Sequence, residues 1–249
     1  MISIVTPVYN AAAFIRQTME MVQAQDYTDW ELILVDDCSK DNSCEIIEEY
    51  LREKPDERIR LIKKEKNEGA ALTRNRGMKE AGGRYIAFLD ADDVWLPHKL
   101  QTQMKFMEET ESGFVFSAYE FGDEEAVGTG RIVHVPEKLT YKEALSRTVI
   151  FTTTVLLDTK KIPKELIYMP NVPSEDSATW WQILRAGYVA QGMDEVLAIY
   201  RRPAKSLSSN KLKAIQRIWY LYREVEKLSL LESCIAFVGW AYRATVRRL

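Results

Sequence analysis

Short apolar runs alternate with amphipathic stretches through the first third of the chain. The runs at residues 2–7, 30–37, 58–63 and 85–89 have the length of strands. Apolar residues at helical spacing follow the first three runs, at residues 14–22, at about 42–53 and between Gly69 and Gly82. Strands that alternate with helices in this way predict an α/β fold with a parallel, right-handed, doubly wound sheet.

The pattern continues less regularly after residue 96. A helix is expected at 97–109 and strands at 114–121 and 131–135. Residues 136–174 contain four prolines among short apolar runs, so we expect irregular structure that shapes a pocket and does not build the sheet. A capped helix at 174–185, one long strand or a strand pair at 188–200, and a C-terminal helical hairpin from 210 to the end complete the expected elements.

Composition and charge narrow the functional classes. The chain has 249 residues, enough for one large α/β domain with an appendage, which we place at 1–209 and 210–249. Residues 1–200 carry 23 Lys and Arg against 34 Asp and Glu, whereas residues 201–249 carry 11 against 3. The acidic body makes nucleic acid a poor partner, and the basic character belongs to the C-terminal helices.

The number and spacing of the cysteines, and the residues at the N-terminus, indicate the cellular compartment of the protein. Cys38, Cys44 and Cys234 are odd in number and form no C-x-x-C pair, which argues against a disulfide framework or a structural zinc site. Residues before the first strand do not resemble a signal peptide. We therefore expect a cytosolic protein with reduced, buried thiols.

The apolar run from Tyr85 to Leu89 ends in three carboxylates, Asp90, Asp92 and Asp93. A buried strand would deliver them to the carboxyl edge of the sheet, where open α/β proteins bind ligands. Neighbouring carboxylates repel each other unless a cation is present. Mg²⁺ or Mn²⁺ held by a D-x-D pair and a substrate diphosphate fits this spacing, and a solvated acidic turn is the alternative.

Five motifs in order resemble the family 2 nucleotide-sugar glycosyltransferases of GT-A fold, in particular non-processive bacterial members. They are Thr6–Asn10, Val35–Asp37, Asn67–Asn75, Phe88–Asp93 and the pair Glu175-Asp176, and the match covers about residues 1–210. The resemblance implies a nucleotide-binding half at 1–95 and an acceptor-binding half at 96–209.

The resemblance also implies roles for individual residues. Thr6, Pro7 and Tyr9 would line the nucleoside pocket, Asp36 would meet the base, and Arg74 would reach the nucleotide. Asp92, with Asp90, would hold Mn²⁺ or Mg²⁺. The implied substrate-binding set is Thr6, Pro7, Tyr9, Asp36, Arg74, Asp90, Ala91, Asp92, Trp181 and Arg201.

The implied reaction is a single displacement with inversion at C1 of the sugar, most often from a UDP-sugar. A metal ion on the diphosphate stabilises the leaving group. One carboxylate takes the proton of the acceptor hydroxyl. Asp176 is the expected base, with Glu175 as the fallback. Among nearby tryptophans, Trp181 is the choice for stacking on an acceptor sugar, although core packing is the commoner role.

Two positions depart from the family pattern. Pro203 stands where relatives often have a histidine near the donor, so Arg201, Arg202 or Lys205 would have to supply that charge. Ala186 stands where processive members carry tryptophan, which favours transfer of a single sugar.

The C-terminal tail leaves two hypotheses open. Cys234–Tyr242 is apolar over nine residues, too short to span a bilayer. With Trp240, Tyr242, Arg243, Arg247 and Arg248 it is typical of an interfacial segment on the inner face of the cell membrane, near a glycan or lipid-linked acceptor. The alternative is a hairpin that packs on the catalytic domain or forms a homodimer.

Other interpretations of the acidic motif remain. Residues 88–94 also fit the motif of a haloacid dehalogenase-type phosphohydrolase, with Asp90 as nucleophile and Asp92 as acid, although that family usually places it on its first strand. A non-catalytic sugar-nucleotide-binding protein is the second alternative. His98 and His134 are expected to be structural.

Overall fold

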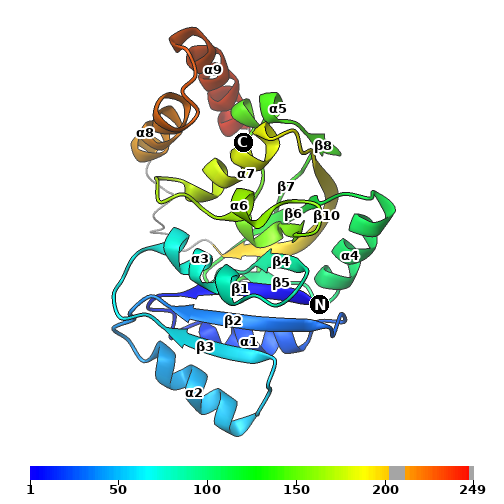
Figure 1. The fold of residues 1–249 in the computed structure, drawn as a ribbon, viewed down its shortest axis with the longest axis vertical. Coiled ribbons are helices and arrows are strands. Elements are labelled where there is room, and N and C mark those ends of the chain that lie inside the picture. Colours follow the sequence, from blue (N-terminus) through cyan, green and yellow to red (C-terminus); the bar gives the residue numbers. More distant parts are fainter. Residues whose placement is uncertain (202–210, 247–249) are drawn as a thin grey trace.

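The computed structural model of the protein describes residues 1–201 and 211–246. One mixed sheet runs through it in the order β3-β2-β1-β4-β9-β6-β10-β5, with β7 beside β6 and β8 beside β10 (Figure 1). The strands are β1 (Ile2–Val8), β2 (Trp30–Asp36), β3 (Ile59–Lys63), β4 (Tyr85–Phe88), β5 (Val94–Trp95), β6 (Phe114–Gly122), β7 (Gly128–Val133), β8 (Lys138–Leu139), β9 (Leu156–Asp158) and β10 (Ala190–Arg201). The α-helices are α1 (Ile15–Gln23), α2 (Ser43–Glu53), α3 (Ala70–Glu80), α4 (Lys99–Glu109), α5 (Tyr141–Ser146), α6 (Lys164–Ile167), α7 (Glu175–Arg185), α8 (Lys211–Tyr220) and α9 (Leu230–Val246).

The N-terminal half is the parallel, doubly wound unit expected from the apolar runs. β1 pairs in parallel with both β2 and β4, and every residue of β2 is buried. The chain steps outward from β1 to β3 and then crosses back to β4, so right-handed connections place α1 and α2 on one face and α3 on the other. At Gly77 a Cβ atom would lie 2.5 Å from a methyl group of Val5, so glycine allows α3 to pack directly on the sheet.

The region expected to be irregular contributes a strand to the centre of the sheet. β9 lies antiparallel between β4 and β6, and its three residues are buried. Asp158 on β9 binds Arg84 through two hydrogen bonds of 2.6 and 2.9 Å. The expectation that residues 136–174 do not build the sheet is therefore wrong, because a three-residue strand is too short to show a period.

The acidic residues after β4 are held between two strands of this sheet. β5 follows them directly and pairs antiparallel with β10 at Trp95 and Ala198. β10 is a single long strand, which resolves the open choice for residues 188–200. The loop from Asp90 to Asp93 is thus anchored at both ends by sheet pairing.

The C-terminal hairpin consists of α8, a π-helical turn (Leu221–Val225) and α9. It lies at one end of the molecule, beside α5 and α7 and far from β3 (Figure 1). Tyr222 donates to the Leu145 carbonyl oxygen at 2.5 Å, and Trp240 donates to Thr148 at 3.2 Å. Packing on the body of the protein, one of the two hypotheses for the tail, is therefore present. None of the helices in the described ranges has the length and apolar character needed to cross a membrane.

Candidate active site

Two cavities meet at the carboxyl ends of β1 and β4. The first, the β1–β4 cavity, has a volume of about 480 Å³. Three acidic side chains, Asp37, Asp90 and Asp92, lie on its wall. Its lining residues are Pro7, Val8, Tyr9, Asn10, Ala11, Phe14, Asp37, Asn67, Gly69, Ala70, Thr73, Arg74, Asp90, Ala91 and Asp92.

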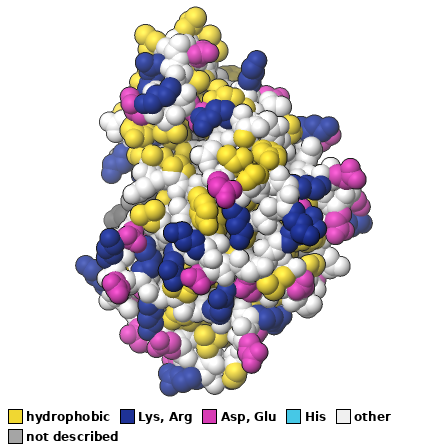
Figure 2. Space-filling model, viewed as in Figure 1, with side chains coloured by type: hydrophobic (Ala, Val, Ile, Leu, Met, Phe, Trp, Pro, Cys, Tyr) yellow, Lys and Arg dark blue, Asp and Glu magenta, His cyan; other side chains and the backbone are white. Residues whose placement is uncertain are grey.

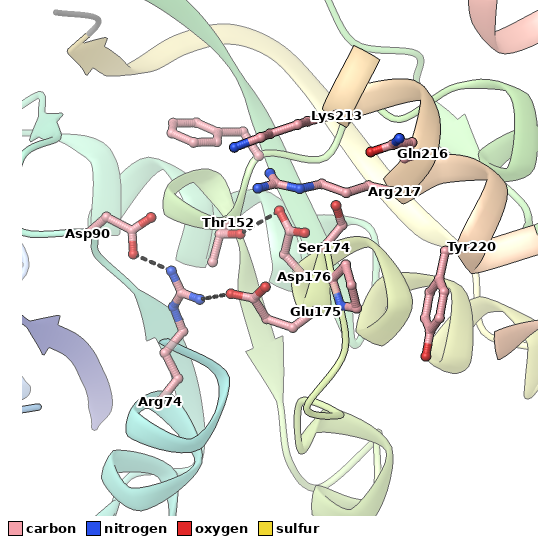
Figure 3. Close-up of a pocket in the computed structure, with 12 residues that line it drawn as sticks. Arg74, Asp90, Thr152, Ser174, Glu175, Asp176, Lys213, Gln216, Arg217 and Tyr220 are labelled. Atoms are coloured by element: carbon pink, nitrogen blue, oxygen red, sulfur yellow. Dashed lines mark hydrogen bonds and ion pairs between the residues drawn. The ribbon is translucent and has the colours of Figure 1, made fainter. Parts of the chain in front are cut away.

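The second cavity, the α7–α8 cavity, has a volume of about 830 Å³ (Figure 3). The first turn of α7 forms one side and one face of α8 the other. Its lining residues are Arg74, Asp90, Phe151, Thr152, Pro173, Ser174, Glu175, Asp176, Lys213, Gln216, Arg217 and Tyr220. Arg74 and Asp90 line both cavities, so the two spaces meet at this pair.

Arg74 on α3 connects the acids of the two cavities. Its Nη2 donates to Asp90 at 2.5 Å and its Nη1 donates to Glu175 at 3.0 Å (Figure 3). Burial disfavours the charged guanidinium, but the carboxylates of Asp90 and Glu175 outweigh it and raise the pKa of Arg74. Arg74 stays charged and fixes Asp90 and Glu175 on either side of it.

Asp92 and Asp93, which follow Asp90 in the loop after β4, are disfavoured in their charged form. Burial, followed by the charge of Asp90, raises the pKa of Asp92, and burial raises that of Asp93 well above its usual range. Among the described residues, neither carboxylate oxygen of Asp93 has a hydrogen-bond partner, although the side chain is buried. Such a cluster is stabilised by a divalent cation.

A cation here would need ligands beyond protein side chains. Within residues 1–201 and 211–246, no three His, Cys, Asp or Glu side chains converge on one point. Mg²⁺ and Mn²⁺ accept one or two carboxylates together with phosphate and water oxygens. Asp92, with Asp90 beside it, therefore fits a site that is completed by a diphosphate.

Glu175 and Asp176 open α7 and face the α7–α8 cavity. Ser174, in the left-handed conformation at φ 56°, precedes them and turns the chain into the helix. Burial, and then the charge of Asp176, raises the pKa of Glu175, while Arg74 opposes this shift. Asp176 accepts a hydrogen bond of 3.4 Å from the hydroxyl of Thr152 (Figure 3). Asp176 is thus less constrained by ion pairing than Glu175.

The expected nucleoside residues divide into two groups. Pro7, Tyr9 and Ala91 line the β1–β4 cavity, and the Tyr9 ring is about half exposed. Thr6 and Asp36 are buried beneath it and do not line it, which corrects that part of the expectation. Thr6 Oγ1 and Asp36 Oδ1 have no hydrogen-bond partner in the described part of the chain.

Asp37, which the sequence interpretation left without a role, supports this cavity. Its carboxylate accepts hydrogen bonds from the backbone amides of Glu68 and Gly69, at 2.9 and 2.8 Å, and from Lys64 at 2.7 Å. These contacts hold the start of α3 against the end of β2. The signal available in the sequence was the pair of acids at the end of a buried strand.

Arg201 and Trp181 have structural positions that differ from the expected ones. Arg201 donates to the Asp92 carbonyl at 2.8 Å, to the Glu124 carbonyl and to Gln17, and it lines neither cavity. It supports the acidic loop from behind. Trp181 is buried on α7, where its ring stacks on Tyr222, so no face is open to a sugar. Trp180 and Trp95 are buried as well.

Several remaining expectations concern residues away from the cavities. His134 pairs with Asp194 at 2.9 Å, and His98 lies 3.7 Å from Glu195. The three cysteines are free, but Cys38 and Cys44 are only partly buried and Cys234 is exposed, which corrects the expectation of buried thiols. Arg202, Pro203 and Lys205 lie outside the described residues.

The sequence interpretation missed the wall of the α7–α8 cavity formed by α8. Lys213, Gln216, Arg217 and Tyr220 occupy positions i, i+3, i+4 and i+7, a spacing that puts them on one helical face. This pattern was present in the sequence. The sequence interpretation considered only the apolar residues of this helix, and these lie on its other face.

Comparisons with known proteins agree with this geometry. Residues 3–159 match the model of glycosyl transferase family 2. TuaG of Bacillus subtilis (strain 168), whose name assigns it to teichuronic acid biosynthesis as a glycosyltransferase, is 42% identical over the whole of this chain and 98% of its own length. WfgD of Escherichia coli, named as a UDP-Glc:α-D-GlcNAc-diphosphoundecaprenol β-1,3-glucosyltransferase, is 36% identical over 88% of this chain and 84% of its own.

Solved structures show the same fold at lower identity. S. aureus TarS, residues 1–349 with UDP-GlcNAc, has a TM-score of 0.70 at 19% identity, covering 96% of this chain and 71% of that one. The mannosyltransferase PcManGT of Pyrobaculum calidifontis, with GDP-Man and Mn²⁺, has a TM-score of 0.73 at 18% identity, covering 97% and 69%. The GT-A fold expected from the motifs is confirmed, and the phosphohydrolase alternative is not supported. The chain belongs to glycosyl transferase family 2.

Proposed function

We propose that the protein is an inverting, non-processive glycosyltransferase that moves one sugar from a UDP-sugar to a hydroxyl group of a lipid-linked glycan precursor. The observation that carries the proposal is that the two cavities meet at Arg74 and Asp90. One cavity has acids suited to a metal diphosphate, and the other has acids suited to accept a proton. A donor and an acceptor bound in them would meet at this junction.

The β1–β4 cavity is the proposed donor site. Tyr9 offers an exposed aromatic face for the nucleoside base. Pro7 and Ala91 line the same cavity and would contact the rest of the nucleotide, whereas Thr6 and Asp36 are buried and support the strand ends from within. UDP-GlcNAc in the TarS complex, and the UDP-Glc in the name of WfgD, favour uridine.

Asp92, assisted by Asp90, is the proposed ligand of Mn²⁺ or Mg²⁺. When bound, the ion would act as a Lewis acid that stabilises negative charge on the leaving diphosphate. The support is that burial and the charge of Asp90 raise the pKa of Asp92 although Arg74 pairs with Asp90, together with Mn²⁺ in the PcManGT complex.

Asp176 is the proposed general base. The acceptor oxygen forms a bond to C1 of the sugar while the bond from C1 to the diphosphate oxygen breaks, and the hydroxyl proton passes to Asp176. Attack from the side opposite the leaving group inverts the configuration at C1. Arg74 holds Glu175 in an ion pair, which makes Glu175 the weaker candidate.

Peripheral membrane contact is proposed for the outer face of α9. Leu231, Ile235, Val238 and Tyr242 follow at spacings of four, three and four residues, and each is at least 65% exposed. Apolar side chains gather at this end of the molecule (Figure 2). An exposed apolar stripe on a basic hairpin suits the surface of an anionic membrane. Trp240 and Arg243, which the sequence assigned to the membrane face, instead bind Thr148 and Ser146.

Turnover of a panel of nucleotide-sugars tests the proposed reaction. We expect Mn²⁺-dependent release of UDP from one UDP-sugar, and loss of release on adding a chelator. NMR of the transferred sugar should show inverted configuration at C1. Absence of turnover with every donor would favour the non-catalytic binding protein, and activity in excess chelator would refute the metal assignment.

A further inference from the structure

The face of α8 that lines the α7–α8 cavity carries two cations one helical turn apart. Lys213 and Arg217 stand on it with Gln216 and Tyr220, and the side chains of Lys213 and Arg217 extend over the cavity (Figure 3). All four are exposed to solvent within the described part of the chain. Nothing in the proposed chemistry at C1 needs positive charge on this wall.

The acids and the cations of the cavity come from different helices. The acids Glu175 and Asp176 come from α7, and Arg74 already pairs with Glu175 and Asp90. Among the described residues, the two further cations of the cavity, Lys213 and Arg217, come from α8, and their side chains extend toward Thr152 and Asp176 (Figure 3). A ligand that fills this space would therefore meet both the proposed proton acceptor and a pair of cations.

We propose, on the basis of the function proposed above, that Lys213 and Arg217 bind the diphosphate of a lipid-diphosphate acceptor while its sugar hydroxyl lies at Asp176. A guanidinium binds phosphate oxygens in a bidentate manner, and a lysine one turn away adds a point charge on the same side. The volume of about 830 Å³ accommodates a sugar and a diphosphate together.

The apolar part of such an acceptor also has a path on this helix. Leu212 and Ile215, next to Lys213 and Gln216 in sequence, are exposed on the same helix. A lipid chain attached to the diphosphate would leave the cavity along these side chains. Inorganic pyrophosphate has no apolar part and would not contact Leu212 or Ile215. Its affinity therefore distinguishes a free inorganic anion from a lipid diphosphate.

Binding of decyl diphosphate, measured by calorimetry without metal or donor, tests the assignment. We expect at least tenfold weaker binding in Lys213→Ala/Arg217→Ala, a smaller loss in Arg217→Lys, and wild-type binding in Lys227→Ala. Lys227 is a matched control because it is an exposed cation of the same hairpin that pairs with Glu224 and does not line the cavity. Circular dichroism and thermal unfolding check that each variant is folded.

Two further binding measurements show in which cavity decyl diphosphate binds. Asp92→Asn should keep wild-type affinity for decyl diphosphate, because it alters only the proposed donor site, and inorganic pyrophosphate should bind at least tenfold more weakly than decyl diphosphate. Any one of four results would overturn the proposal. Decyl diphosphate could bind the double variant as tightly as the wild type, or it could lose affinity only in Asp92→Asn. Pyrophosphate could bind as tightly as decyl diphosphate, or decyl diphosphate could fail to bind the wild type at millimolar concentration. The assay needs no turnover, so it can fail while the nucleotide-sugar reaction succeeds, and the reverse.

Discussion

The ring of Trp181 on α7 lies parallel to that of Tyr222 in the C-terminal hairpin, with planes 2° apart and centroids separated by 5.5 Å. Both side chains are buried. Arg185, one turn further along α7, donates to Glu226 at 2.6 Å. The helix that begins with the proposed base is therefore packed directly against the hairpin that forms the opposite cavity wall.

Truncation of this stacked pair should destabilise the protein. We expect Trp181→Ala to lower the free energy of unfolding by about 3–5 kcal/mol, the usual cost of removing a buried aromatic side chain. Urea denaturation measures the change, and Leu231→Ala, at an exposed position of α9, is the control with an expected effect within about 0.5 kcal/mol. A loss below about 1 kcal/mol in Trp181→Ala would mean that the hairpin is not part of the folded unit.

Replacement of the proposed base should reduce the chemical step. Asp176→Asn should lower kcat by roughly 10²- to 10⁴-fold with little change in the KM of the donor, because the amide cannot take the acceptor proton. Glu175→Gln weakens the ion pair with Arg74 but keeps Asp176, so we expect a smaller loss of kcat. Steady-state kinetics of both variants shows which of the two carboxylates is the base. The reverse order of effects would assign the base to Glu175.

The sequence predicted the β-α units and most acids of the site because these signals are local. A buried parallel strand is a continuous apolar run, and Asp90 and Asp92 follow such a run directly. The position of β9 depends on pairing with strands distant in sequence, and three residues cannot carry a period. The burial of Arg201 was missed, and that of Trp181 was left as the alternative to sugar stacking, for the same reason, since both are covered by elements that no local pattern identifies.

Lys99, at the start of α4, gives a pH dependence that the sequence also did not indicate. Its side chain is fully buried, its ammonium lies 4.0 Å from the Trp95 ring and donates to Gln103, and burial lowers its pKa to about 7. In the unfolded chain the lysine titrates near 10.4. Between these values the unfolded state binds the extra proton, so this group makes the protein more stable as pH rises from about 7 to 10.

Lys99→Met removes this contribution and tests it. The variant should be more stable than the wild type at pH 7, and the difference should shrink by up to about 1.4 kcal/mol per pH unit as pH rises toward 10. Urea denaturation of both proteins over this range measures the trend, and comparison with the wild type cancels the other titrating groups. A difference that does not vary with pH would show that Lys99 stays charged when folded.

The outer stripe of α9 predicts binding to anionic vesicles. Leu231→Ser/Ile235→Ser/Val238→Ser should reduce flotation with phosphatidylglycerol vesicles at least tenfold, because it removes the exposed apolar side chains. Deletion of the helix would be less informative, since Phe237 and Trp240 pack against other parts of the protein. Flotation of Leu212→Ser, which removes an exposed apolar side chain of α8, is measured for comparison. Equal flotation of the triple variant and the wild type would exclude this face as the membrane contact.

Substitution of the proposed metal ligand Asp92 should weaken binding of the ion without unfolding the protein. Asp92→Asn should raise the Mn²⁺ concentration for half-maximal activity at least tenfold and lower kcat by about 10²-fold or more, because the lost Lewis-acid assistance amounts to several kcal/mol. Asp194→Asn, a carboxylate near His134, is the control. An unchanged Mn²⁺ titration would require a different ligand.

Arg201 gives the acidic loop a shape that does not depend on its own carboxylates. The guanidinium holds the main chain at Asp92 and Glu124 and the side chain of Gln17 together. The loop is therefore preorganised, and losing the negative charge of Asp92 leaves its scaffold in place. The proposed ion ligand and the support of the loop are therefore different residues, so a substitution at Asp92 can abolish one role and leave the other intact.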